Sequence, residues 1–213
     1  MNPKPPSPQA PPVVRAVGDS ALVVDLPDQG AALGFWRTVQ HRPGPGQQEA
    51  VAGARSVLVR YAAGTDVSAL ATFLRQVVPI PARDRSTELI TIETVYDGAD
   101  LDEVGDLTGL GRDEVVAAHT GVEWTVAFTG FAPGFGYLTG PAHRLRVPRR
   151  AHPRTVVPAG AVGLAGEFSG IYPRPSPGGW QVIGRTNARL WDLDRDPPAL
   201  LRPGMRVRFV DTS

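Results

Sequence analysis

The fold of the C-terminal half is decided by the stretch Thr155-Val156-Val157-Pro158-Ala159-Gly160-Ala161-Val162-Gly163-Leu164-Ala165. Its two apolar runs, Thr155–Val157 and Ala161–Ala165, have strand length and are separated by turn-forming residues. Downstream, further runs of the same kind are bounded by Gly and Pro: Trp180–Gly184, Ala188–Leu193 and Met205–Val210. Short strands at this regular spacing, beginning near Trp124, predict a β-barrel or closed sandwich.

The last of these runs also predicts which side chains face the core. Period-two alternation places Val207 and Phe209 inside and Arg206 and Arg208 outside.

A different pattern precedes the barrel region. Arg15–Leu26 predicts a hairpin and Ser56–Tyr61 a strand, while Ala31–Gln40 fits a short helix. Asp66 is placed to cap a second helix, which ends before Pro79. Strands interleaved with helices predict a small α+β domain over residues 13–84.

The segment Pro79–Thr87 combines prolines with charged residues and is interpreted as a linker, so the second domain is expected to span residues 85–213. A strand over Leu89–Tyr96 opens it. Asp100, with Glu103 three residues on, resembles a capping box, and a second helix is expected near Arg112–His119.

Composition limits where the protein acts and what it binds. The formal charge is +1, from 22 basic and 21 acidic residues, so no global field attracts nucleic acid or an anionic membrane. No apolar run approaches the roughly 18 residues of a membrane span. Residues 1–12 contain six prolines, which predicts a disordered tail rather than a signal peptide. We therefore expect a cytoplasmic protein.

Several chemistries are excluded by residue content. The chain has no cysteine, and Lys4 is its only lysine, so a P-loop or a Schiff-base mechanism is not expected. If ATP is used, another subunit should bind it. The four histidines lack zinc-site spacing, and no metal site is expected: His41, His119, His143 and His152.

The segment Gly130–Leu138 is the first candidate for function. It presents Phe131, Pro133, Phe135 and Tyr137 between glycines that permit close approach of a ligand or partner. The alternative is an aromatic turn that closes the barrel core.

Two further segments carry polar candidates. Guanidinium groups that can bind a carboxylate or phosphate are close together in the segment Arg146–Arg154. The alternative is a solvated loop. Among these arginines, Arg154 is the best candidate for binding. In the other segment, Trp180 begins a strand after a tight turn, and Gln181 and Arg185 are expected on one face of a pocket. Tyr172 lies shortly before that turn.

No nucleophilic triad can be recognised, because Ser169 and Ser176 have no histidine near them in the sequence. The catalytic residue is therefore unknown, with His119, Arg154 and Arg185 as weak candidates. His119 could equally be a helix C-terminal residue favoured by the helix dipole.

An ordered series of motifs extends from about residue 88 to the end of the chain. Its members are His119, Gly130–Leu138, Pro148-Arg149, Pro153–Gly160, Gly170-Ile171-Tyr172-Pro173, Ser176–Thr186 and Leu201-Arg202-Pro203-Gly204. This series resembles the family that comprises the B subunits of 5-oxoprolinase, the Kip inhibitors and allophanate hydrolase subunit 1.

The resemblance implies a small α+β N-terminal domain followed by a mainly β cyclophilin-like barrel domain. It also implies membership of an ATP-dependent complex that opens 5-oxoproline to glutamate, with this chain inactive alone. The implied partners are a homologous second protein, of the 5-oxoprolinase C-subunit or Kip-antagonist type, and a separate third protein of the A-subunit type. The alternatives are a protein-binding regulator that inhibits a histidine kinase and a subunit related to allophanate hydrolase and urea amidolyase.

The candidate residues, taken together with this resemblance, lead to a hypothesis about the site. A pocket is expected between Phe131, Pro133, Phe135, Tyr137, Tyr172 and Trp180, with three polar anchors for a carboxylate substrate: Arg154, Gln181 and Arg185. The rival hypothesis makes the same aromatic residues a docking surface for another protein.

Overall fold

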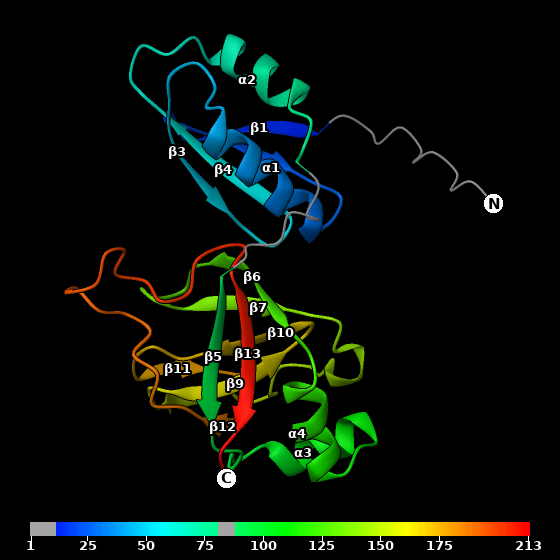
Figure 1. Cartoon of the computed structure of the whole chain (residues 1–213). Helices are drawn as coiled ribbons and strands as arrows, with labels where there is room; N and C mark the ends of the chain where they lie inside the picture. The colour runs from blue at the N-terminus through cyan, green and yellow to red at the C-terminus, as the bar shows by residue number, and fades with distance from the viewer. Residues whose placement is uncertain (1–11, 81–87) are drawn as a thin grey trace. The chain divides into compact units, whose positions relative to one another are not determined.

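The computed structural model describes residues 12–80 and 88–213 (Figure 1). The chain divides into two compact units, Met1–Arg83 and Asp84–Ser213, each of which is described separately below. Almost all of the predicted Pro-rich tail, residues 1–12, lies outside the described residues. So do most of the predicted linker Pro79–Thr87 and the predicted boundary between residues 84 and 85.

The first unit contains a four-stranded antiparallel sheet in the order β1-β2-β4-β3. Its elements are β1 (Val13–Val17), β2 (Ala21–Asp25), α1 (Gln29–His41), β3 (Gln47–Ala52), β4 (Ser56–Tyr61) and α2 (Val67–Gln76). The predicted hairpin is confirmed by the β1–β2 pairing. Asp66 caps α2 as predicted, because its Oδ1 accepts a hydrogen bond from the Ala69 N–H at 3.0 Å.

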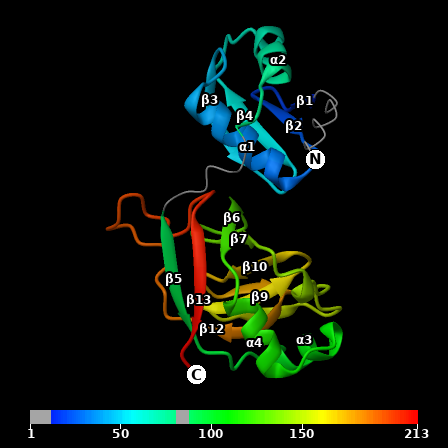
Figure 2. The same cartoon turned by 45° about the vertical axis from the view of Figure 1, so that its right-hand side comes forward.

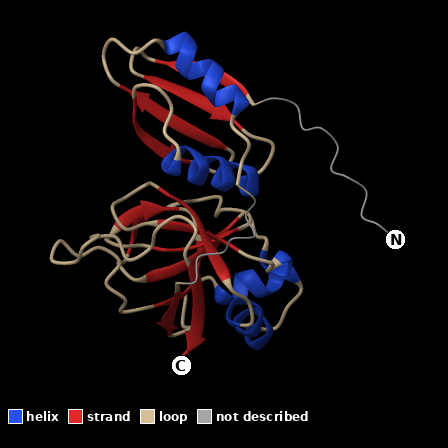
Figure 3. Cartoon of the chain, turned by 45° about the horizontal axis from the view of Figure 1, so that its top comes forward, coloured by secondary structure: helices blue, strands red, loops and turns tan. Residues whose placement is uncertain are grey.

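Helices α1 and α2 lie against the four-stranded sheet (Figure 3). Side chains from both helices join one apolar cluster with the sheet. Phe35 and Val39 come from α1, Leu70 and Leu74 from α2, and all four are fully buried. Trp36 packs at the margin of this cluster and donates its indole N–H to the Ala50 carbonyl at 3.0 Å. The first unit therefore has a core of its own.

The second unit is mainly β. Its elements are β5 (Leu89–Thr94), α3 (Leu101–Thr108), α4 (Arg112–Thr120), β6 (Trp124–Thr129), β7 (Gly136–Thr139), η1 (His143–Leu145), β8 (Arg154–Val157), β9 (Ala161–Ala165), β10 (Phe168–Ile171), β11 (Ser176–Gly178), β12 (Gln181–Arg185) and β13 (Arg206–Asp211). In Figure 2, β5 and β13 run side by side and α3 and α4 lie beside the barrel. No helix in the described ranges is long and apolar enough to cross a membrane.

Seven strands form a single sheet in the order β12-β9-β10-β7-β6-β13-β5. Its two edge strands, β12 and β5, meet through the bridge between Val95 and Arg185, in which each residue donates to the other at 2.9 Å. The sheet therefore forms a nearly closed barrel, as predicted for this half of the chain. β8 and β11 pair separately.

The alternation predicted for the last strand is confirmed. Val207 and Phe209 on β13 are 0% and 1% exposed and lie in the main core cluster. Arg206 and Arg208 point outward, where both pair with the carboxylate of Glu123, at 2.9 and 2.6 Å.

Two local predictions are wrong. Ala188–Leu193 is not a strand, since its one bridged residue is Trp191, in an isolated bridge. Arg189 instead pairs with Asp192 at 3.1 Å in a stretch without regular secondary structure. Asp100 occupies the N-cap position of α3, but its side chain makes no capping hydrogen bond.

Candidate functional site

Five of the predicted site residues line one cavity of about 290 Å³ in the second unit: Phe131, Phe135, Tyr137, Tyr172 and Trp180. We call this the aromatic pocket. Its remaining lining residues are Arg149, Pro153, Pro177, Gly178 and Gly179. The residues come from β7 and the loop before it, the loop before β8, the end of β10, and β11 with the turn that follows it, which the barrel brings together.

Phe135 is the centre of the aromatic pocket. Its ring makes edge-on contacts with Phe131, Tyr137, Tyr172 and Trp180, with centroid separations from 4.9 to 5.5 Å. Edge-to-face pairs at these distances contribute about 0.5–1.5 kcal/mol each beyond their buried area. Because Phe135 itself is 2% exposed, it fixes the shape of the wall, and its neighbours present their surfaces to the cavity.

Phe131 has an unusual conformation. It is the one non-glycine residue with positive φ, at 69°, in the described ranges of the chain, and its side chain is 56% exposed. A positive φ at a bulky residue costs of order 1–3 kcal/mol and tends to occur at functional positions. Phe131 also lines a second groove with Pro133 and Trp191, so it separates two concave surfaces.

Close packing behind the aromatic pocket requires glycine. A Cβ placed on Gly178 would lie 2.3 Å from the Tyr172 hydroxyl, and one on Gly170 would lie 3.0 Å from the rings of Phe135 and Trp180. Both positions let the backbone approach the aromatic rings. This explains why glycines interrupt the aromatic motifs in the sequence.

The pocket carries one cation, Arg149, which belongs to the predicted guanidinium segment Arg146–Arg154, although only Arg154 of that segment was predicted as a site residue. Between residues 88 and 213 no carboxylate pairs with its guanidinium. Burial raises the pKa of the Tyr172 phenol, while a backbone hydrogen bond from Trp180 and the charge of Arg149 act in the opposite direction. An exposed, unpaired arginine beside aromatic walls can bind a small carboxylate.

Arg154 already binds a carboxylate of this chain. Its Nη1 and Nη2 each donate to one oxygen of the buried Asp100 at 2.7 Å, in a bidentate pair. Arg150 and the Val182 N–H donate to the same carboxylate. Burial alone would raise the pKa of Asp100, but these hydrogen bonds and the two guanidinium charges hold it below its usual value. The role of Arg154 as a substrate anchor stays a prediction.

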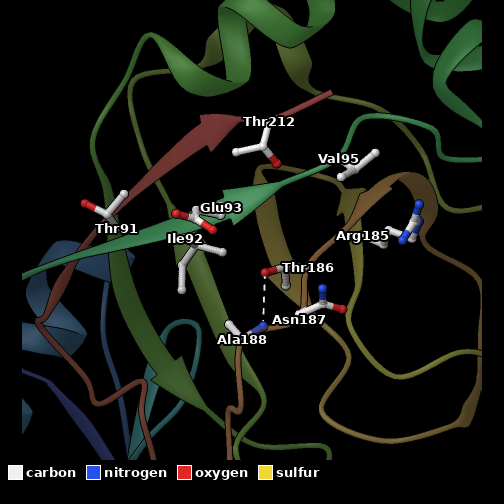
Figure 4. A pocket seen from close by; sticks show the side chains of 9 residues that line it. All are labelled: Thr91, Ile92, Glu93, Val95, Arg185, Thr186, Asn187, Ala188 and Thr212. Atoms are coloured by element: carbon white, nitrogen blue, oxygen red, sulfur yellow. Dashed lines mark hydrogen bonds between the residues drawn. The ribbon is translucent and has the colours of Figure 1, made fainter.

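Gln181 and Arg185 are not on one face. The β12 register shifts between Val182 and Gly184, a bulge that changes the alternation along the strand. Gln181 is 1% exposed, with its Nε2 3.5 Å from Glu103 Oε1, whereas Arg185 is exposed and donates to Asp97 at 2.9 Å. Neither lines the aromatic pocket. Arg185 instead lines a separate polar cavity (Figure 4).

His119 lies in the core. Its Nδ1 is 2.6 Å from the Tyr96 hydroxyl and its Nε2 is 2.8 Å from Ser169 Oγ. The contact with Ser169 was not predicted, because the two residues are far apart in the sequence. Burial lowers the pKa of His119 to about 3, so the imidazole is neutral. Its position in the last turn of α4 is as predicted, but the dipole explanation, which needs a cation, is wrong. With 0% exposure it meets no ligand in this conformation.

In the part of the chain that the structure describes, no group of three or more His, Asp or Glu side chains is placed to hold a metal ion.

Comparison with known proteins agrees with the motif resemblance. A family model described as the carboxyltransferase domain, subdomain C and D, matches residues 12–201. The chain is 39% identical to the B subunit of 5-oxoprolinase from Escherichia coli O157:H7, covering 91% of this chain and 93% of that protein. Identity to the 5-oxoprolinase B subunit of Bacillus subtilis strain 168 is 33%, covering 94% and 92%.

Solved structures share the fold. The crystal structure of TTHA0988 matches 94% of this chain with a TM-score of 0.77 and 33% identity. This chain spans only 40% of the length of TTHA0988. The conserved uncharacterized protein PH0987 of Pyrococcus horikoshii matches with a TM-score of 0.58 and 31% identity, covering 94% of this chain and 98% of that one.

The family-model match covers most of the described residues, and both 5-oxoprolinase proteins align over nearly their whole length. The chain therefore belongs to the family of carboxyltransferase subdomains C and D that includes the B subunits of 5-oxoprolinase.

Proposed function

We propose that this chain is a subunit of an ATP-dependent 5-oxoprolinase complex that opens 5-oxoproline to glutamate and is inactive without its companion subunits. The observation that carries the proposal is the 39% identity to the E. coli B subunit along almost the full length of both chains. The companions are a homologous protein of the C-subunit type and a separate protein of the A-subunit type.

The aromatic pocket supports a small carboxylated ring as the substrate. Arg149 supplies a guanidinium for the carboxylate, and the rings of Phe131, Tyr172 and Trp180 supply apolar surface for the ring carbons. The barrel itself is of the cyclophilin-like type that the motifs imply.

The lining of the pocket supports a role for companion subunits. The pocket contains no histidine, carboxylate or serine that could act as a base or nucleophile, judged from its ten described lining residues. The only lysine of this chain is Lys4, so the chain has no P-loop, and we assign ATP binding to another subunit. We therefore assign phosphoryl transfer to the companions and substrate binding to this chain.

The test is ATP-dependent release of glutamate from 5-oxoproline, measured with the purified chain alone and after mixing with companion subunits from the same source. Activity in the mixture and none with the chain alone is the expected result. A mixture that assembles but hydrolyses neither ATP nor 5-oxoproline would contradict the proposal.

A second candidate function is supported by the exposure of Phe131. Together with Trp191, which is 38% exposed, it lines an open groove of about 430 Å³ that could bind another protein. In a regulator that binds a histidine kinase, Phe131→Asp would abolish kinase binding without lowering the melting temperature. In the hydrolase, the same change would raise KM for 5-oxoproline instead.

A further inference from the structure

The barrel has a seam that its own strands do not close. β12 and β5 are the two edges of the sheet, and in the described ranges the one bridge across them joins Arg185 to Val95, the residue after β5. If the chain continued straight after Arg185, residues 187 and 189 would lie opposite Glu93 and Thr91. Instead residues 186–190 are in no strand, and in the described ranges no bridge to β5 follows the one at Arg185. One stretch of β5 therefore has no strand on its outer side.

The main-chain groups that face this seam can be identified. The carbonyls of Glu88 and Thr94 accept from Arg206 and Thr212, at 3.1 and 3.0 Å, on the β13 side, whereas Val95 bonds to β12 on the other side. Because main-chain direction alternates along a strand, the N–H and C=O of Thr91 and Glu93 face the same side as those of Val95. In the described ranges of the chain, no strand pairs with this side of Thr91 and Glu93.

A cavity of about 390 Å³ occupies the seam (Figure 4). We call it the seam slot. β5 forms one wall, and the segment that leaves β12 forms the other. Its lining residues are Thr91, Ile92, Glu93, Val95, Arg185, Thr186, Asn187, Ala188 and Thr212. The slot thus combines open main-chain donors and acceptors with polar side chains.

The charge of the seam slot is negative. Arg185 is neutralised by Asp97, with 2.9 Å between Nε and Oδ2. Glu93 is exposed, and among the described residues no cation pairs with its carboxylate. The other polar lining side chains are hydroxyls and an amide. A ligand that places a cation near Glu93 is therefore favoured over an acidic one.

We propose that the seam slot binds an extended, lysine- or arginine-bearing segment of a companion subunit, which adds to the barrel as a strand beside β5. Thr91 and Glu93 lie two residues apart, about 6.7 Å along the strand, and this repeat matches the main chain of another strand. Glu93 on this edge strand disfavours pairing with an acidic or wholly apolar strand and permits pairing with a basic one. This inference rests on the proposed function, because the segment belongs to the companion.

Amide hydrogen exchange on the full chain, with and without the companion subunits, tests the proposal. In the assembled complex, the amides of Thr91 and Glu93 should exchange at least about tenfold more slowly than in the free chain. Unchanged exchange at both amides in a complex that assembles and releases glutamate would overturn the strand inference and leave the proposed function intact.

A matched pair of variants removes the hydrogen bond selectively. Thr91→Pro deletes an N–H that makes no hydrogen bond to β13. The sheet should tolerate this substitution, because edge strands tolerate proline. Thr91→Val keeps the N–H. The proline variant should weaken complex formation roughly tenfold, the loss of about one hydrogen bond, and the valine variant should not. Equal affinity of the two variants would contradict the proposal.

If the companions fail to assemble with the chain, the proposed function is wrong and a peptide decides the strand inference. The probe is a short alternating Thr and Val peptide with one central Lys, compared with the same peptide carrying Glu. The Lys peptide should shift the NMR signals of the Thr91 and Glu93 amides more than the Glu peptide does. No shift at these amides with either peptide would overturn the inference.

Discussion

At the scale of single residues, the buried carboxylate of Asp100 holds several segments together. It accepts hydrogen bonds from Arg150 in the loop before β8, from Arg154 at the start of β8 and from the Val182 N–H of β12. Removing one partner of a buried pair leaves the other charges without compensation.

Asp100→Ala should therefore lower the free energy of unfolding by about 3 kcal/mol. Asp97→Ala, which removes an exposed ion pair with Arg185, should cost less than about 1 kcal/mol. Urea denaturation of both variants measures the difference. Equal stabilities would show that the Asp100 cluster contributes no more than a surface pair.

His119 predicts a pH dependence. Its folded pKa of about 3 lies below the value of about 6.5 expected in the unfolded chain, so the unfolded chain binds more protons between these values. Stability conferred by neutral His119 is present above pH 6.5 and is lost as the pH falls toward 3. The imidazole resonances of His119 should not titrate between pH 8 and 5. A midpoint near 6.5 for these resonances would contradict its placement.

Arg149 should matter for substrate binding. Arg149→Ala should raise KM for 5-oxoproline by roughly tenfold or more in the assembled complex, because a charge-assisted hydrogen bond to the carboxylate is lost. Arg146→Ala is the matched control, since Arg146 lies in the same loop but does not line the aromatic pocket. Equal KM values for the two variants would show that Arg149 does not bind the substrate.

At the scale of elements, the barrel depends on close contact between β12 and the segment after β5. A Cβ on Gly98 would lie 2.3 Å from the backbone of Val182 and Ile183. Gly98→Ala should therefore cost about 1–3 kcal/mol, the usual cost of overpacking. Gly130→Ala, where a Cβ meets nothing within 4 Å, should leave the melting temperature nearly unchanged. A Gly98→Ala protein as stable as the wild type would show that the two segments separate easily.

Elements with strong local signals were predictable from the sequence. The predicted strand over Ala161–Ala165 coincides with β9, and the helix over Arg112–His119 differs from α4 by one residue. β3, in contrast, was not predicted, because its sequence Gln47–Ala52 is polar and has only Ala50 and Ala52 buried. Its strand conformation comes from pairing with β4, which is tertiary information.

The site was predictable in part, for a similar reason. Aromatic residues between glycines indicated the pocket, and the barrel does bring Phe131, Tyr172 and Trp180 together. The position of Arg185 was not predictable, since one bulge in β12 changes the direction of its side chain. Nor could sequence spacing show that Ser169 contacts His119.

At the scale of the whole chain, each compact unit has its own buried core. The cluster around Phe35 and Leu70 belongs to the first unit, and the cluster around Trp124 and Phe209 belongs to the second. Side chains of this size buried within one unit should support independent folding.

A fragment spanning residues 84–213 should therefore unfold cooperatively, as measured by circular dichroism during heating. The same fragment ending at residue 205, which lacks β13, should show no cooperative transition, because β13 lies between β5 and β6. Loss of cooperativity in the longer fragment would mean that the second unit needs the first in order to fold.

The parallel pairing of β5 with β13 has a consequence for biosynthesis. Leu89 pairs with Arg206. The main-chain groups of β5 that face β13 therefore have no hydrogen-bond partners until β13, the last strand of the second unit, has been synthesised. The first unit, built from a hairpin and near neighbours, can fold as soon as it leaves the ribosome, whereas the barrel cannot be completed during most of its translation. Ribosome-bound chains halted before β13 should expose β5 and depend on chaperones, although they already carry every residue of the aromatic pocket.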